Sequence, residues 1–190
     1  MSVKKRDNLS ISPWIRRFSG LFPKDGTVLD LAAGGGRHSR WLLEQGHLVT
    51  ALDRQTDALL DLQKSDSTAS ERLEVITADL EDGSPWPLSN RRFDAVIAVN
   101  YLWRPLFPSI LDSIEEGGLL LYETFAVGHE AFGRPTNPEF LLRPGELLNM
   151  VAGHLTVIAY EHGRIDGSGG PAIKQRIAAG GGDLVFPIPS

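Results

Sequence analysis

Residues 28–40 read VLDLAAGGGRHSR, and this stretch decides the fold. A short apolar run with Asp30 near its end is followed by small residues and then by a segment of helical character. Small residues let the backbone approach a ligand closely, and the N-terminus of the next helix directs free N–H groups and its positive dipole end to the same place. The stretch therefore predicts a strand, a tight turn and a helix around a nucleotide-type pocket.

A dinucleotide-binding turn is one alternative for this stretch. Its glycines follow the pattern G-x-G-x-x-G after a purely apolar strand. Here the third glycine would fall at Ser39, and Asp30 lies where that strand is normally apolar. Both features disfavour a nicotinamide oxidoreductase, and a glycine-rich turn that binds no ligand is a second alternative.

Residues 30–36 resemble motif I of the class I S-adenosylmethionine-dependent methyltransferases, acid-x-G-x-G-x-G. Ala32 stands where that family has its first glycine, and alanine is small enough that we expect the turn to be kept. The resemblance implies that Asp30 holds the ammonium group of S-adenosylmethionine through a water or the backbone. It also implies that Gly34 and Gly36 leave room for the methionyl and ribose parts.

Two further acids continue the resemblance. Asp53 ends the predicted strand 47–53 and matches the motif II acid, which accepts hydrogen bonds from the two ribose hydroxyls. Asp79 follows the predicted strand 73–77 and resembles the motif III acid, which would accept from the adenine amino group while the N–H of Leu80 meets the ring. Arg37 could pair with the carboxylate of the methionine part, and Arg54 completes this side of the pocket.

The end of the predicted strand 93–100 separates sub-classes. Asn100 is at the motif IV position, where cofactor and substrate meet. Methyltransferases that act on amino groups of nucleic-acid bases carry Asn/Asp-Pro-Pro-aromatic there, whereas this chain has Tyr101 and Leu102 in place of the prolines. The formal net charge of −5 gives no overall attraction to phosphate backbones. A nucleic-acid target is therefore disfavoured.

The amino-acid composition excludes several classes of site. The 190 residues contain no cysteine, which excludes disulfides, thiolate metal sites and thiol nucleophiles. No histidine and acid have the spacing of a metal site, so we expect no required metal. The absence of an apolar leader or a membrane-spanning run favours a cytoplasmic protein without membrane contact. The oligomeric state is not predicted.

We expect one domain over residues 13–190 after a mobile segment, residues 1–12. The predicted fold is an α/β Rossmann-like three-layer sandwich, with a mostly parallel seven-stranded sheet that ends in a C-terminal antiparallel hairpin. A hairpin is expected because the glycine-rich connection near residues 163–170 is too short for a crossover helix. Residues 65–70 are predicted to be a polar loop, residues 81–92 an irregular loop, and residues 126–142 a lid over the site.

The acceptor side is predicted from side chains near the strand ends. Methyl transfer by in-line displacement needs alignment and exclusion of water, and a hydroxyl or amine acceptor also needs a base. The candidate bases are Tyr101, His38, His129 and Glu123. The candidate substrate residues are Tyr101, Trp103, Arg104 and Arg143, with either arginine available for an anionic substrate. Core packing, helix capping or surface exposure is the structural alternative for each of them.

Within the class, residues 36–39 and 140–147 most resemble the small bacterial methyltransferases related to tellurite-resistance and thiopurine enzymes. That resemblance implies a methyltransferase with S-adenosylmethionine as cofactor, S-adenosylhomocysteine as product and a small-molecule acceptor. A protein or nucleic-acid methyltransferase is the first alternative. A catalytically degenerate S-adenosylmethionine-binding protein is the second.

Overall fold

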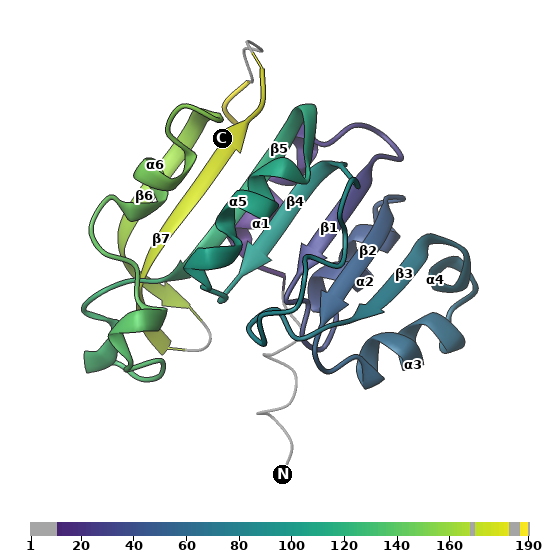
Figure 1. The fold of residues 1–190 in the computed structure, drawn as a ribbon, viewed down its shortest axis with the longest axis horizontal. Helices are drawn as coiled ribbons and strands as arrows, with labels where there is room; N and C mark the ends of the chain where they lie inside the picture. Colours follow the sequence, from purple (N-terminus) through teal and green to yellow (C-terminus); the bar gives the residue numbers. More distant parts are fainter. Residues whose placement is uncertain (1–10, 168–169, 183–186, 190) are drawn as a thin grey trace.

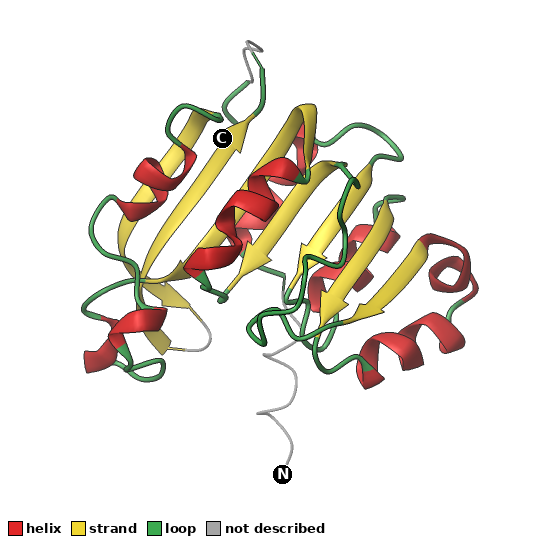
Figure 2. Ribbon diagram, in the orientation of Figure 1, coloured by secondary structure: helices red, strands yellow, loops and turns green. Residues whose placement is uncertain are grey.

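The computed structural model describes residues 11–167, 170–182 and 187–189. One sheet in the order β3-β2-β1-β4-β5-β7-β6 forms the centre of the molecule, with helices on both faces (Figures 1 and 2). Its strands are β1 (Thr27–Leu31), β2 (Leu48–Asp53), β3 (Leu73–Thr77), β4 (Phe93–Val99), β5 (Ile114–Phe125), β6 (Thr156–Gly167) and β7 (Gly170–Gly180).

The sheet has a parallel and an antiparallel part. Strands β1 to β5 pair in parallel, whereas β7 is antiparallel to both β5 and β6. The β6–β7 register continues to the pair Gly167–Gly170, so the two strands form a hairpin. The predicted α/β Rossmann-like fold, with seven strands and a C-terminal antiparallel hairpin, is confirmed.

The helices divide between the two faces of the sheet. Ala95 and Ile97 of β4 belong to the core under α1, α2 and α3, whereas Val96 and Ala98 belong to the core under α5 and α6. Within the described residues, no helix is long and apolar enough to cross a membrane. The helices are α1 (Pro13–Phe18), α2 (Arg37–Glu44), α3 (Asp57–Ser65), α4 (Ser67–Arg72), α5 (Phe107–Asp112) and α6 (Glu146–Val151), with 3-10 turns η2 (Ser19–Leu21), η3 (Arg104–Leu106), η4 (His129–Ala131) and η5 (Pro138–Phe140).

One connection differs from its prediction. Residues 65–70, expected to be a polar loop, contribute to the short helix α4. The carboxylate of Asp66 caps this helix by accepting from the N–H groups of Thr68 and Ala69 at 2.8 and 3.1 Å, and Ala69 is buried. The cap and one apolar contact thus offset the low helix propensity of a serine- and threonine-rich sequence. Residues 81–92 contain no helix, as predicted.

The start of the described chain is anchored. Residues 1–10 of the segment predicted to be mobile lie outside the described residues, but Ile11 and Ser12 are buried, in contrast to that prediction. The hydroxyl of Ser12 caps α1 by accepting from the N–H groups of Trp14 and Ile15. The Trp14 indole N–H donates to the carbonyl of Ile177 at 3.1 Å, so α1 is tied to β7 across the sheet.

Candidate cofactor and acceptor site

The carboxyl ends of the parallel strands meet at one edge of the sheet, and the turn after β1 lies there (Figure 1). Ala32, Gly34 and Gly36 all have left-handed backbone conformations, with φ of 53°, 56° and 73°. A Cβ on Gly36 would lie 2.6 Å from the Leu59 side chain, so Gly36 makes room for α3. The predicted role of Gly36 in leaving room for the cofactor is not what the structure gives it. A Cβ on Gly34 would meet open space.

Asp30 is buried beneath this turn. Its carboxylate accepts a hydrogen bond from the Ser39 hydroxyl at 2.6 Å and thereby holds the start of α2. Burial raises the pKa of Asp30 to about 6, against the lowering effect of the bonds from Ser39 and the charge of Arg37. Asp30 lines neither of the two cavities described below, so it would act on a ligand through α2 and the turn.

The smaller cavity, of about 320 Å³, lies beyond the ends of β1, β2 and β3. Asp53 is fixed at its wall, because its carboxylate accepts from the N–H groups of Gly34 and Gln55, each at 2.8 Å. The turn after β1 is thus tied to the end of β2. The cavity contains most of the residues predicted for the adenosine end of the cofactor; its lining is Ala32, Asp53, Arg54, Ala78, Asp79, Leu80, Glu81, Tyr101 and Phe140.

Tyr101 belongs to this smaller cavity. Its hydroxyl is buried and has no hydrogen-bond partner among the described residues. Burial, with the charges of Glu81 and Asp79, raises the pKa of Tyr101 above its ordinary range, so the hydroxyl stays protonated as a donor. Tyr101 thus lines the same cavity as Asp53 and Asp79, whereas the candidate bases Glu123 and His129 line the larger one.

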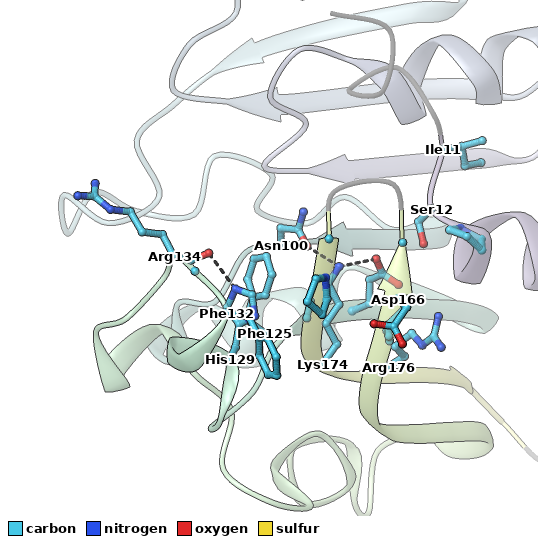
Figure 3. A pocket seen from close by; sticks show the side chains of 18 of the residues that line it. Ile11, Ser12, Asn100, Phe125, His129, Phe132, Arg134, Asp166, Lys174 and Arg176 are labelled. Carbon is cyan, nitrogen blue, oxygen red and sulfur yellow. Dashed lines mark hydrogen bonds and ion pairs between the residues drawn. The ribbon is translucent and has the colours of Figure 1, made fainter. Parts of the chain in front are cut away.

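A larger cavity, of about 750 Å³, is lined by residues of β5, β6, β7, residues 126–142 and the start of the described chain (Figure 3). At its centre the Lys174 ammonium donates to the Asn100 amide oxygen at 2.7 Å and to the Glu123 carboxylate at 2.9 Å. Lys174 and Glu123 have side chains that are 13% and 5% exposed, so this is a buried ion pair. Glu123, predicted as a candidate base, is held by a cation.

The two candidate histidines have different surroundings. His38 is buried and its Nε2 accepts from the Ser12 N–H at 3.2 Å. Burial, and then the charges of Arg37 and Lys174, lowers the pKa of His38 to about 3. The structure thus gives His38 an anchoring role instead of the predicted role as a base.

His129 lines the larger cavity. Its ring stacks on that of Phe125, with 4.2 Å between the ring centroids. Its Nε2 forms a hydrogen bond of 2.9 Å with the Arg134 carbonyl (Figure 3). Nδ1 is buried without a partner among the described residues. The described residues contain no group of three or more His, Asp or Glu side chains that could hold a metal ion.

Arg104, Trp103 and Arg143, predicted to contact substrate, line neither cavity. Arg104 binds Glu146 through two hydrogen bonds of 2.6 and 3.0 Å and also donates to the Leu141 carbonyl. Its donors are thus used to join α6 to the preceding segment. Trp103 packs against the core on the α5 side. Arg143 is exposed.

Residues 126–142 contact both cavities. The segment contains the turns η4 and η5, and its ends meet in a bridge between Ala126 and Leu142. Phe132 lines the larger cavity and Phe140 the smaller one. The segment therefore contributes side chains to both cavities, and its role as a lid stays a prediction.

Lys174 and Arg176 are functional candidates that the sequence analysis missed. They are two apart on β7, so both point to the same face, and both line the larger cavity. The register places Lys174 opposite Phe125 and Arg176 opposite Glu123. In the sequence, the only indication of such a role is that two cations, Lys174 and Arg176, stand at alternate positions of one strand. The pairing of β7 with β5 is what brings them to the larger cavity.

A family model described as a methyltransferase domain matches residues 28–117. The match covers 90 of the 190 residues, just under half of the chain. The predicted resemblance to the class I S-adenosylmethionine-dependent methyltransferases is confirmed by this match and by the fold. Comparison with curated protein sequences gave no match.

Solved structures share the fold of this methyltransferase domain. TehB from Haemophilus influenzae superposes with a TM-score of 0.73 at 16% identity, over 94% of this chain and 65% of that one. The chain thus spans just under two thirds of the TehB chain. A Burkholderia thailandensis 1,6-didemethyltoxoflavin-N1-methyltransferase, solved with 1,6-didemethyltoxoflavin and S-adenosylhomocysteine bound, gives 0.68 at 18% identity, over 96% and 82%. The glycopeptide N-methyltransferase MtfA, complexed with S-adenosylmethionine, gives 0.62 at 22% identity, over 88% and 92%.

Proposed function

We propose that this chain transfers a methyl group from S-adenosylmethionine to a small-molecule acceptor. The observation that carries the proposal is that two segments of the chain line both cavities. After β1, Ala32 of the turn lines the smaller cavity and Arg37, the first residue of α2, lines the larger one. After β4, Tyr101 lines the smaller cavity and Asn100 the larger one. A long ligand can therefore extend from one cavity to the other across these segments.

The residues of the smaller cavity fit the adenosine end of that cofactor. Asp53 would accept from the ribose hydroxyls, Asp79 from the adenine amino group, and the Leu80 N–H would meet the ring. The buried Tyr101 hydroxyl is a donor without a partner among the described residues, and a bound nucleoside would offer it an acceptor. Arg54 adds a cation at the same wall.

The turn and the larger cavity fit the methionyl end. Arg37 would hold its carboxylate, Gly34 leaves open space, and Asp30 would fix the start of α2 from below. When bound, the cofactor supplies an electrophilic methyl group that an acceptor lone pair displaces in line. The chain's own contribution would be to align the acceptor and exclude water. His129, with one unpartnered ring nitrogen, is the candidate base for a hydroxyl or amine acceptor.

The position of residues 126–142 favours a small acceptor over a macromolecule. Residues 126–142 contribute to both cavities, which limits the approach of a folded protein or a duplex. The toxoflavin-type enzyme was solved with a small heterocycle, whereas MtfA is an enzyme of glycopeptides, so the fold alone serves acceptors of different sizes.

Calorimetry tests the cofactor. We expect S-adenosylmethionine and S-adenosylhomocysteine to bind with micromolar dissociation constants, and the Asp53→Ala variant to bind at least about thirtyfold more weakly, because charge-assisted hydrogen bonds to two hydroxyls are lost. Asp61→Ala is the matched control, since Asp61 is exposed on α3. Binding of NADH but of neither sulfur nucleotide would overturn the proposal. If no nucleotide binds, the cofactor part of the proposal fails, and the degenerate S-adenosylmethionine-binding alternative fails with it.

The acceptor is then sought by measuring the formation of S-adenosylhomocysteine. Thiols, amines and oxyanions are supplied one at a time with saturating cofactor. Turnover with a small compound supports the proposal. Turnover only with protein or nucleic-acid substrates would contradict the small-molecule part and leave the cofactor part intact.

A further inference from the structure

The larger cavity is cationic in a chain that is acidic overall. The whole sequence has a formal net charge of −5, yet the cavity is lined by the acids Glu123 and Asp166 against a larger set of cations. Those cations are Arg16, Arg37, Arg134, Lys174 and Arg176. A wall of one sign around a concave site attracts ligands of the opposite sign.

Local ion pairs do not remove this excess. Glu123 is paired with Lys174 at 2.9 Å, and Asp166 is paired with Arg164, which lies outside the lining. Arg176 is paired with Glu161, also outside the lining. The ion pairs between described residues include none with Arg16, Arg37 or Arg134, so these three cations have no acidic partner within that part of the chain.

The cofactor does not account for the excess either. The methionyl end of S-adenosylmethionine has one carboxylate, but it also has an ammonium and a sulfonium, so it carries a net charge of about +1 at neutral pH. Arg37, beside Gly36, is enough for the single carboxylate. The remaining cations would repel the sulfonium unless a further anion enters the cavity with it.

Aromatic side chains lie beside Lys174. Its ammonium is 5.1 Å from the centroid of the Phe125 ring, and that ring stacks on His129 at an interplanar angle of 24°. Phe132 beside them is 43% exposed although it is a large apolar side chain (Figure 3). An exposed aromatic side chain at a cavity is a contact surface for a flat apolar ligand. The Arg134 guanidinium, by contrast, extends away from Lys174 (Figure 3).

On these grounds we propose that the acceptor is an organic anion with a flat ring, whose anionic group lies against Lys174 and Arg176 and whose ring lies against Phe125, His129 and Phe132. Lys174 is held in place by Asn100 and Glu123, which reduces the entropy lost when it binds the anion. The Arg176 side chain is 18% exposed and lines the same cavity, so its guanidinium can contact an anion there while Nη2 keeps its bond to Glu161. This inference rests on the proposed function.

Three probes test it by calorimetry on protein saturated with S-adenosylhomocysteine at low ionic strength. Benzoate has the ring and the charge, benzamide has the ring without the charge, and acetate has the charge without the ring. We expect benzoate to bind at least about tenfold more tightly than either of the others. Benzamide binding as tightly as benzoate would overturn the anionic part, and acetate binding as tightly would overturn the aromatic part.

Variants assign the effect to the cavity. Arg176→Met leaves Glu161 with its second partner, Arg17, and should reduce the preference for benzoate over benzamide to below about threefold without changing the affinity for S-adenosylhomocysteine. Arg40→Met removes the same charge from the exposed face of α2 and should leave the preference unchanged. Equal effects of the two variants would overturn the assignment, because they would show a response to overall charge alone.

The double variant Glu123→Gln with Lys174→Met removes the central pair without leaving a buried charge. We expect it to lose the preference for benzoate as Arg176→Met does, and a retained preference would remove Lys174 from the proposal. If S-adenosylhomocysteine does not bind to the wild-type chain, the proposed function fails, while the comparison of benzoate with benzamide on the protein alone still tests the anion site.

Discussion

The two cavities are built in different ways from the two parts of the sheet. The smaller one takes most of its residues from the turns that directly follow β1, β2 and β3, and adds Tyr101 after β4 and Phe140 from residues 126–142. The larger one takes them from β5, β7, residues 126–142 and the start of the described chain, which are far apart in the sequence. The first kind of site is carried by local turn motifs, whereas the second depends on strand register and long-range packing.

This contrast predicts that substitutions around the larger cavity affect folding first, because its polar groups are paired with one another. Lys174→Met leaves the carboxylate of Glu123 buried and unpaired, and we expect the free energy of unfolding to fall by about 3 kcal/mol. Urea denaturation measures the loss. The double variant Glu123→Gln with Lys174→Met should recover most of it. A single variant as stable as the wild type would show that the pair does not hold the two strands.

Arg104→Ala tests the same contrast at the edge of the site. Loss of the two bonds to Glu146 and of those to backbone carbonyls should lower the free energy of unfolding by about 2 kcal/mol. Arg143→Ala is the control, and because that side chain is exposed its effect should stay within about 0.5 kcal/mol. Equal losses in the two variants would contradict the anchoring role of Arg104.

On the side of the turn after β1, the expected effect is on pH dependence. The pKa of His38 in the folded chain, about 3, is below its unfolded value of 6.5, so the unfolded chain binds the proton first. Its contribution to stability is therefore complete above pH 6.5 and is lost as the pH falls towards 3, with a slope of up to about 1.4 kcal/mol per pH unit.

Asp30 works in the opposite direction. Its folded pKa of about 6 is above the unfolded value of 3.8, so protonation of the folded chain favours folding as the pH falls through 6. The difference between wild type and His38→Gln, measured by urea denaturation from pH 4 to 7, isolates the histidine. We expect that difference to shrink as the pH falls, and a constant difference would contradict a buried neutral His38.

The smallest expected effect lies at Ala32. This residue has a left-handed backbone conformation, with φ of 53°, which alanine adopts with strain. Ala32→Gly should raise the free energy of unfolding by about 1 kcal/mol and leave cofactor affinity unchanged. Ala33→Gly, at a neighbour without positive φ, should lower it by a similar amount. Thermal denaturation distinguishes the two, and a loss of stability in Ala32→Gly would contradict the strain.

The sequence predicted the elements whose signals are local. The mostly parallel seven-stranded sheet and its C-terminal hairpin follow from apolar runs and turn residues, and the structure contains both. The resemblance to motifs II and III implied that Asp53, Asp79 and Leu80 lie together, and all three line the smaller cavity. The predicted roles of Gly36 and His38 differ from their contacts in the structure. Gly36 packs against Leu59 and His38 binds Ser12, and neither contact can be inferred from the residues next to them in the sequence.

The acceptor side was the least predictable. Arg104 follows the end of β4 and was expected to bind substrate, but its partners, Glu146 and the carbonyls before it, are set by how α6 packs. Lys174 was missed because its position depends on the pairing of β7 with β5. Side chains whose role is fixed by a distant partner carry no periodic or motif signal.

The segment of residues 126–142 is fastened at both ends. The Ala126 N–H donates to Ile173, the Leu142 N–H donates to Phe125 and the Val127 N–H donates to Leu142, while Arg104 binds the carbonyl of Leu141. Such a loop cannot swing open about one hinge. Its two ends are fixed by these hydrogen bonds, so insertions and substitutions can be accommodated only between them. Because the entropy of closing a loop grows slowly with its length, new acceptor specificities can arise by insertion there without rebuilding the sheet.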